Sequence, residues 1–171
     1  MKTKTMVLPP VVIAAALFAA GLRAQTSPAD IPYTDARVEK LAGNFQFTEG
    51  PAADGEGNVY FTDIPNNRIH TWSVDGSLSI FIQNTGGANG LMFDGAGNLI
   101  ACAGGTGKLI AIAPDKNVTV LAATYNGQRF NSPNDLWIDP NEGIYFSDPR
   151  YGRRDDLPQD GEHVYYLTPD R

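Results

Sequence analysis

Three polar side chains recur at matching places in the sequence and could together hold a metal ion. They are Glu49 in the run Thr-Glu-Gly-Pro, Asn89 in Ala-Asn-Gly-Leu and Asn134 in Pro-Asn-Asp-Leu. Each stands at the start of a short segment that favours an extended strand. One carboxylate and two amides offer oxygen ligands, which suit a hard cation such as calcium or magnesium better than zinc. The alternative is that Asn-Gly and Asn-Asp are simply turn-forming pairs.

These three residues head three copies of one sequence repeat. The offsets between them are 40 and 45 residues, and Asp54, Asp94 and Asp139 follow at the same offsets. Each unit predicts an inner strand, a turn rich in glycine and asparagine, a second strand (residues 59–62, 99–102 and 144–147) and a third strand. A fourth strand follows in the first two units. Four antiparallel strands in each unit of this length are typical of a β-propeller blade.

The fold class predicted from this repeat is all-β, with about three blades at residues 49–84, 89–123 and 134–171. Equivalent residues of successive blades lie at equal distance from the propeller axis, so the oxygens of Glu49, Asn89 and Asn134 are expected to converge on one mouth of the central channel. Propellers close with about four to eight blades. We therefore expect the chain to be part of a longer protein, although a shortened gene product is the alternative, and we expect unpaired strand edges in the free chain.

The N-terminus has the layout of a secretory signal peptide. Lys2 and Lys4 precede an apolar run over residues 7–22, and the pair Ala24-Gln25 offers a cleavage point. We therefore predict a signal peptide at residues 1–24, a linker at 25–35 and the partial propeller at 36–171. The protein is then expected to be secreted or periplasmic, with no membrane attachment after cleavage. An uncleaved membrane anchor is the alternative.

The composition of the chain limits the kinds of partner and catalytic mechanism that we expect. The chain has 171 residues and a net charge of −6, and it shows no basic stripe, so we expect no nucleic-acid partner. The one cysteine, Cys102, lies in an apolar strand pattern and is expected to be a buried small hydrophobe. The two histidines, His70 and His163, lie in outer-strand patterns, where we expect solvated or hydrogen-bonded side chains. No Gly-x-Ser-x-Gly motif of a serine hydrolase is present.

Four motifs in order resemble the gluconolactonase/regucalcin (senescence marker protein) family from about residue 36 onward. They are Phe-Thr-Glu-Gly-Pro at residues 47–51, the repeated Asp-x-x-Gly-Asn-x-Tyr-Phe-x-Asp unit, Arg-Phe-Asn-Ser-Pro-Asn-Asp at 129–135, and Tyr-Phe-Ser-Asp-Pro-Arg-Tyr-Gly at 145–152. The resemblance implies a six-bladed propeller with a divalent metal in its central channel. The implied metal is calcium, with Mg²⁺, Mn²⁺ or Zn²⁺ as alternatives. The implied activity is hydrolysis of a small-molecule lactone, commonly a sugar lactone.

The resemblance also implies roles for individual residues. Glu49 matches a metal-ligating carboxylate, and Asn134 matches an asparagine that ligates the metal or holds its water and substrate. Arg129 resembles an arginine that contacts substrate hydroxyls, and Asn89 joins it as a substrate-binding candidate. Asp148 could line the substrate entrance, or it could simply cap a turn. The two remaining metal ligands, one of them the expected catalytic base, come from later blades of the family, so no catalytic residue is predicted in this chain.

The function predicted on these grounds is a secreted, metal-dependent lactonase that polarises the lactone carbonyl for attack by water. A non-enzymatic propeller that binds a ligand or a protein is the alternative, since this fold supports many unrelated roles. The lactone, the metal and the oligomeric state are not specified by the sequence.

Overall fold

A computed structural model describes residues 36–170 of the chain. The predicted signal peptide (1–24) and linker (25–35) lie outside these described residues. The compact unit that carries the sheets begins at Leu41, and residues 36–40 lie outside it. Over the described part of the chain, no helix is long and apolar enough to cross a membrane.

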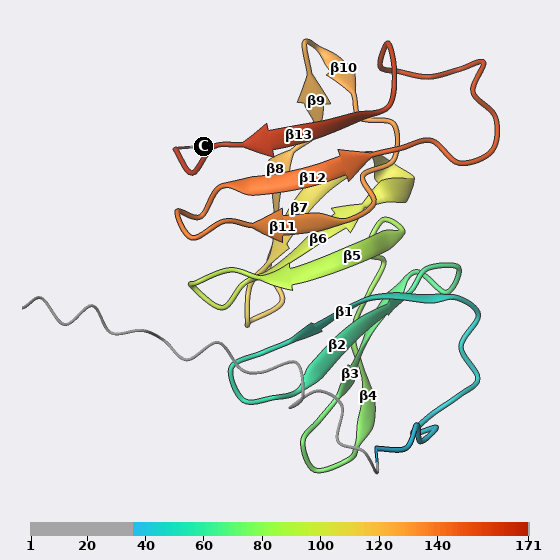
Figure 1. Ribbon diagram of the computed structural model, residues 1–171, viewed down its shortest axis with the longest axis vertical. Helices are drawn as coiled ribbons and strands as arrows, with labels where there is room; N and C mark the ends of the chain where they lie inside the picture. Colours follow the sequence, from blue (N-terminus) through green and yellow to red (C-terminus); the bar gives the residue numbers. More distant parts are fainter. Residues whose placement is uncertain (1–35, 171) are drawn as a thin grey trace, which may run out of the picture. The chain divides into compact units, whose positions relative to one another are not determined.

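Three antiparallel sheets follow one another along the chain (Figure 1). The first has the order β1 (Thr48–Ala53), β2 (Val59–Asp63), β3 (Arg68–Trp72) and β4 (Leu78–Gln83). The second has the order β5 (Ala88–Phe93), β6 (Leu99–Ala103), β7 (Lys108–Ile112) and β8 (Val118–Ala122). The third has three strands, β11 (Leu136–Ile138), β12 (Ile144–Asp148) and β13 (His163–Leu167). The described residues also form a short hairpin of β9 (Thr124–Tyr125) and β10 (Gln128–Arg129) and a 3₁₀ turn, η2 (Gly104–Thr106).

The predicted all-β fold with a repeated four-stranded unit is confirmed. The second strands β2, β6 and β12 each extend one residue beyond the predicted range. The hairpin β9–β10 was not predicted, although its turn carries a recognisable signal. Asn126 and Gly127 both have positive φ, 51° and 78°, which is the backbone that an Asn-Gly pair adopts in a two-residue hairpin turn.

The apolar core lies between the sheets rather than inside any one of them. Alternate residues of β6 point to opposite faces. Leu99 and Ala101 belong to the cluster shared with the first sheet, whereas Ile100 and Cys102 belong to the cluster shared with the third sheet. All five residues of β6 are buried. The middle sheet is therefore covered on both faces, which is how blades of a propeller pack.

Glycines allow the inner strands to approach each other at the point where the predicted site residues lie. A Cβ on Gly50 would lie 2.8 Å from the Cα of Gly90, and a Cβ on Gly90 would lie 2.7 Å from the Cα of Asp135. The amide of Gly90 also donates to the carbonyl oxygen of Asn134, at 2.7 Å. Because no side chain separates the strands here, Glu49, Asn89 and Asn134 start from neighbouring backbone positions.

Buried aspartates hold the segments that lead into the first and third inner strands. Asp63, at the end of β2, accepts the backbone amides of Gln46 and Phe47 at 3.2 and 3.1 Å. Asp148, at the matching end of β12, accepts those of Asn131 and Ser132 at 2.8 and 2.7 Å. In both cases the amides belong to the residues three and two positions before the site residue. These hydrogen bonds therefore fix the backbone that leads directly into Glu49 and Asn134.

The middle sheet holds its lead-in segment differently, because Ala103 stands where the aspartate would be. The side-chain oxygen of Asn67, from the β2–β3 turn of the first sheet, accepts the amide of Gly87 at 2.9 Å and the hydroxyl of Thr85 at 3.1 Å. The segment before Asn89 is thus held by the preceding sheet.

We expect Gly90→Ala to lower the free energy of unfolding by about 1–3 kcal/mol, because the new Cβ overpacks the backbone of the third sheet. Gly55→Ala is the matched control. A Cβ on Gly55 meets no atom within 4 Å, so its stability is expected to be unchanged or slightly higher. Urea unfolding of the two variants measures the difference. Equal stabilities would contradict the close approach described above.

We expect Asp63→Asn to lower stability by about 1–3 kcal/mol at neutral pH, because the backbone amides of Gln46 and Phe47 lose a charged acceptor. Burial acts to raise the pKa of Asp63, but hydrogen bonds from Asn66, Phe47 and Gln46 outweigh it and the pKa lies below its ordinary value. A lowered pKa contributes stability above the unfolded value, about 3.9, that is lost as the pH falls.

The difference between wild type and Asp63→Asn should therefore shrink below about pH 4. Asp115→Asn, in an exposed turn, serves as the control and should stay close to wild type throughout. Unfolding curves recorded between acid and neutral pH check this. A gap between Asp63→Asn and wild type that is constant with pH would show that the carboxylate charge does not hold the segment.

Candidate functional site

Glu49, Asn89 and Asn134 line one cavity of about 610 Å³. Glu49 and Asn89 are the second residues of β1 and β5, and Asn134 lies two residues before β11, so all three lie at the entry to an inner strand, as the repeat predicted. Phe47, Tyr151 and Ser132 are among the other lining residues. The structure therefore brings together the three oxygen-bearing side chains that sequence spacing singled out.

The oxygens of these three side chains are available to a ligand. Among the residues that the structure describes, no hydrogen bond or ion pair involves the side chains of Glu49, Asn89 or Asn134. The backbones of Glu49 and Asn134 form hydrogen bonds to β2 and β12 or pair with them. Within residues 36–170, no lysine or arginine lines the cavity to balance the charge of Glu49. An uncompensated carboxylate beside two free amides fits a hard cation with oxygen ligands.

The ligand set on this chain is nevertheless small. Residues 36–170 contain no group of three or more His, Cys, Asp or Glu side chains that could hold a metal ion. Calcium takes six to eight oxygen ligands, and the cavity offers one carboxylate and two amides. The donor types fit calcium, and further ligands must come from water, substrate or other protein segments.

Asp148 does not line this cavity, but it bonds to a residue that does. Its side chain is fully buried, and its two carboxylate oxygens accept the amides of Asn131 and Ser132. Burial raises the pKa of Asp148 despite the opposing effect of these two hydrogen bonds. In the described residues Asp148 thus holds the backbone before Asn134, and its role at the substrate entrance stays a prediction.

Arg129 also lies outside the cavity lining. It ends strand β10 of the short hairpin and is exposed. Its guanidinium packs over Gly107, where a Cβ would lie 2.8 Å from Nη2. The hairpin itself is held by Gln159, whose side-chain amide donates to the carbonyl oxygens of Gln128 and Arg129 at 2.9 Å each. The resemblance implies that Arg129 contacts the substrate, and this role stays a prediction.

The expectation for His70 was wrong. His70 is buried, its ring stacks on Phe61 at 5.3 Å, and neither ring nitrogen has a hydrogen-bond partner among the described residues. Burial lowers its pKa. Phe45, from the segment before β1, covers the same ring edge-on at 5.1 Å. Sequence alternation missed this packing because Phe45 lies outside the repeat.

The expectations for His163 and Cys102 are confirmed. His163 is partly exposed and shares a 2.8 Å hydrogen bond with Asp160. Cys102 is fully buried in the core, and burial raises the pKa of its thiol. The environments of both residues agree with the hydrogen-bonded histidine and the buried cysteine that the sequence predicted.

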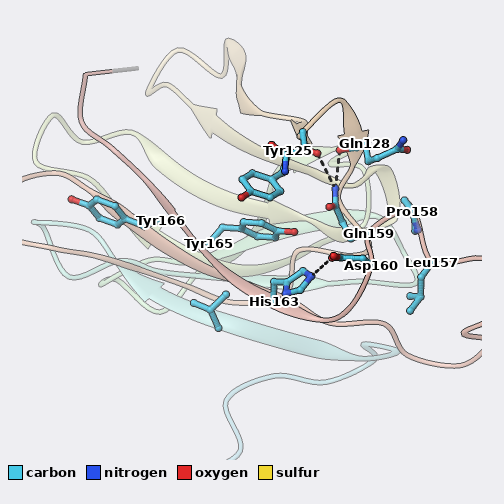
Figure 2. Close-up of a pocket in the computed structure, with 11 residues that line it drawn as sticks. Tyr125, Gln128, Leu157, Pro158, Gln159, Asp160, His163, Tyr165 and Tyr166 are labelled. Atoms are coloured by element: carbon cyan, nitrogen blue, oxygen red, sulfur yellow. Dashed lines mark hydrogen bonds and ion pairs between the residues drawn. The ribbon is translucent and has the colours of Figure 1, made fainter.

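A larger cavity of about 970 Å³ lies beside β13 (Figure 2). Tyr125, Gln159, His163 and Tyr165 are among its lining residues, and none of the residues predicted for the site lines it. Sequence analysis gave no signal for this cavity. Size alone does not make it the functional site, because the three matching residues of the sequence repeat line the smaller cavity.

Comparison with known proteins identifies the family. The family model described as SMP-30/gluconolactonase/LRE-like region matches residues 47–171. A gluconolactonase from Zymomonas mobilis is 31% identical over 153 residues, covering 78% of this chain and 43% of the relative. The solved structure of a gluconolactonase from Xanthomonas campestris is 29% identical with a TM-score of 0.72, covering 76% of this chain and 46% of that one.

A calcium-binding regucalcin from Agrobacterium tumefaciens shares the fold, with 21% identity and a TM-score of 0.63 over 77% of this chain and 48% of that one. The chain thus spans about half the length of the relatives it matches. The extent of the family match, together with the sheets that carry Glu49, Asn89 and Asn134, leads to one conclusion: the chain belongs to the SMP-30/gluconolactonase/LRE-like family.

Proposed function

We propose that the protein containing this chain is an exported, metal-dependent lactonase that hydrolyses a sugar lactone, with calcium as its cation. The observation that carries the proposal is the convergence of the free oxygens of Glu49, Asn89 and Asn134 on one cavity. Membership of a family whose named relatives include gluconolactonases supports the substrate class. Export rests on the predicted signal peptide.

In this proposal the residues of the chain bind and orient. Glu49 supplies the negative charge that holds the cation, and the amide oxygens of Asn89 and Asn134 complete its side of the coordination. Each amide nitrogen remains free to donate to a hydroxyl of the sugar or to the attacking water. When bound, the cation polarises the lactone carbonyl and stabilises negative charge that develops on its oxygen.

The other residues at the cavity bear on this chemistry. Phe47 and Tyr151 line the same cavity and are 57% and 72% exposed, so water reaches these walls. Glu49 is the one acidic residue lining this cavity among residues 36–170. If it holds the cation, the base that activates water comes from another part of the protein, as the resemblance implies.

The test is hydrolysis of gluconolactone by the protein at the length that its gene encodes, with the uncatalysed rate subtracted. Chelation should abolish turnover, and calcium should restore it. Glu49→Gln should lower kcat/KM by about 100-fold or more, because the cavity loses the charge that holds the cation. Asn134→Ala should lower it by about 10- to 100-fold.

Glu56→Gln, in the exposed turn after β1, is the matched control and should retain wild-type kinetics. Turnover that survives both chelation and Glu49→Gln would contradict the proposal. Retained calcium binding with no lactone turnover would favour the non-enzymatic binding role.

A further inference from the structure

We infer that Thr62 is a positioning residue for the proposed cation site, because its hydroxyl holds the backbone of Glu49 beside a β-bulge. The inference rests on the proposed function, since it concerns how firmly Glu49 is aimed at the cation. It starts from an irregularity that the three inner strands share.

A β-bulge interrupts strand pairing at the site residues of the first two sheets. The register of β1 on β2 shifts between Glu49 and Ala52, and that of β5 on β6 shifts between Ala88 and Leu91, an interval that contains Asn89. A bulge places an extra residue in one strand, so that two residues oppose one. Bulges are common beside functional sites, where they re-aim a side chain.

The third sheet has the same arrangement just before β11. Asn134 donates its amide to the carbonyl oxygen of Ser147 at 2.9 Å, and the amide of Ser147 donates to the carbonyl oxygen of Asp135 at 3.0 Å. Two residues, Asn134 and Asp135, therefore face Ser147 alone. The irregular pairing thus recurs at all three candidate ligands, which indicates that it belongs to the site and not to one strand.

The second strand of each sheet places one small residue opposite the site residue. Thr62 pairs with Glu49 in the first sheet. Cys102 and Ser147 have the equivalent places in the second and third sheets, at the offsets of 40 and 45 residues that define the repeat. These three side chains differ as hydrogen-bond donors, because a hydroxyl is a full donor and a thiol is a weak one.

Thr62 uses its hydroxyl on the backbone of Glu49. The residue is fully buried, and its side-chain oxygen donates to the carbonyl oxygen of Glu49 at 3.1 Å. The next residue, Gly50, has a positive φ of 53°, in a region that glycine enters freely. The hydroxyl therefore restrains the peptide plane between Glu49 and this glycine. Because Asp63 holds the amide of Phe47, the backbone around Glu49 is held on both sides.

The equivalent residues of the other two sheets hold their bulges less firmly. The hydroxyl oxygen of Ser147 accepts the amide of Asp135 at 3.3 Å, in a more exposed place. Cys102 is fully buried, and its thiol forms no hydrogen bond among the described residues. The firmest restraint therefore falls on Glu49, the one charged residue among the three candidate ligands.

A restrained ligand binds a cation more tightly than a free one. When Glu49 is already held in one orientation, less conformational freedom is lost as the ion binds, so the affinity is higher. Groups that orient a metal ligand without touching the metal change affinity by about 10- to 100-fold. Thr62 acts on the backbone of Glu49 and not on its carboxylate, so we expect an effect at the lower end of this range.

Calorimetric titration of calcium into the metal-free protein, at the length that its gene encodes, tests the inference without a turnover assay. Thr62→Val has nearly the same size but lacks the hydroxyl, so the calcium dissociation constant should rise about tenfold. Thr62→Ser keeps the hydroxyl and should stay within about twofold of wild type. Thr62→Cys copies the second sheet and should behave like Thr62→Val, which provides a second variant if Thr62→Val folds poorly.

Thr106→Val is the control for loss of a threonine hydroxyl elsewhere. This hydroxyl donates to the carbonyl oxygen of Ala103 at 3.2 Å, a bond of the same kind that involves no candidate ligand, so calcium affinity should not change. Urea unfolding of each metal-free variant measures stability separately. A merely structural hydroxyl would change the free energy of unfolding and leave the calcium dissociation constant of the folded protein unchanged.

Wild-type calcium affinity in both Thr62→Val and Thr62→Cys would overturn the inference and leave the proposed cation site in place. A loss in Thr62→Ser as large as that in Thr62→Val would also overturn it, because packing and not the hydroxyl would then matter. A wild-type protein that binds no calcium would instead contradict the proposed function, and with it the inference.

Discussion

Close backbone approach between successive inner strands is the constraint on which the candidate site depends. Gly50 lies against Gly90, and Gly90 lies against Asp135, at distances that leave no room for a Cβ. A side chain at either glycine would push the strands apart and separate Glu49 from the two asparagines. Asp63 and Asp148 also position the site, because their carboxylates hold the backbone segments that lead into the first and third of these strands.

Much of this arrangement could be predicted from the sequence, because the repeat encodes it locally. The offsets of 40 and 45 residues aligned Glu49, Asn89 and Asn134, and equivalent positions in stacked sheets necessarily lie close together. The features that sequence spacing did not predict depend on contacts between distant segments. Burial of His70 depends on Phe45, and the hydrogen bonds of Asp148 join it to amides 16 and 17 residues earlier in the chain.

The same stacking that forms the site leaves two faces of the described chain uncovered. Each sheet presents one face to its predecessor and one to its successor, and the core lies between them. Aromatic residues on the last face, Trp137, Tyr145 and Tyr166, contact one another but no following sheet. Site and faces are therefore linked, because both follow from the same stacking of the sheets.

The central claim is that Glu49, Asn89 and Asn134 converge on one cation. Crystals of the protein grown with terbium in place of calcium test it most directly, since an anomalous difference map locates the ion. The account predicts a peak about 2.3–2.6 Å from the Glu49 carboxylate and the Asn134 side-chain oxygen, which disappears in Glu49→Gln. An ion bound only at another position, or none in a crystal that diffracts well enough to show these side chains, would contradict it.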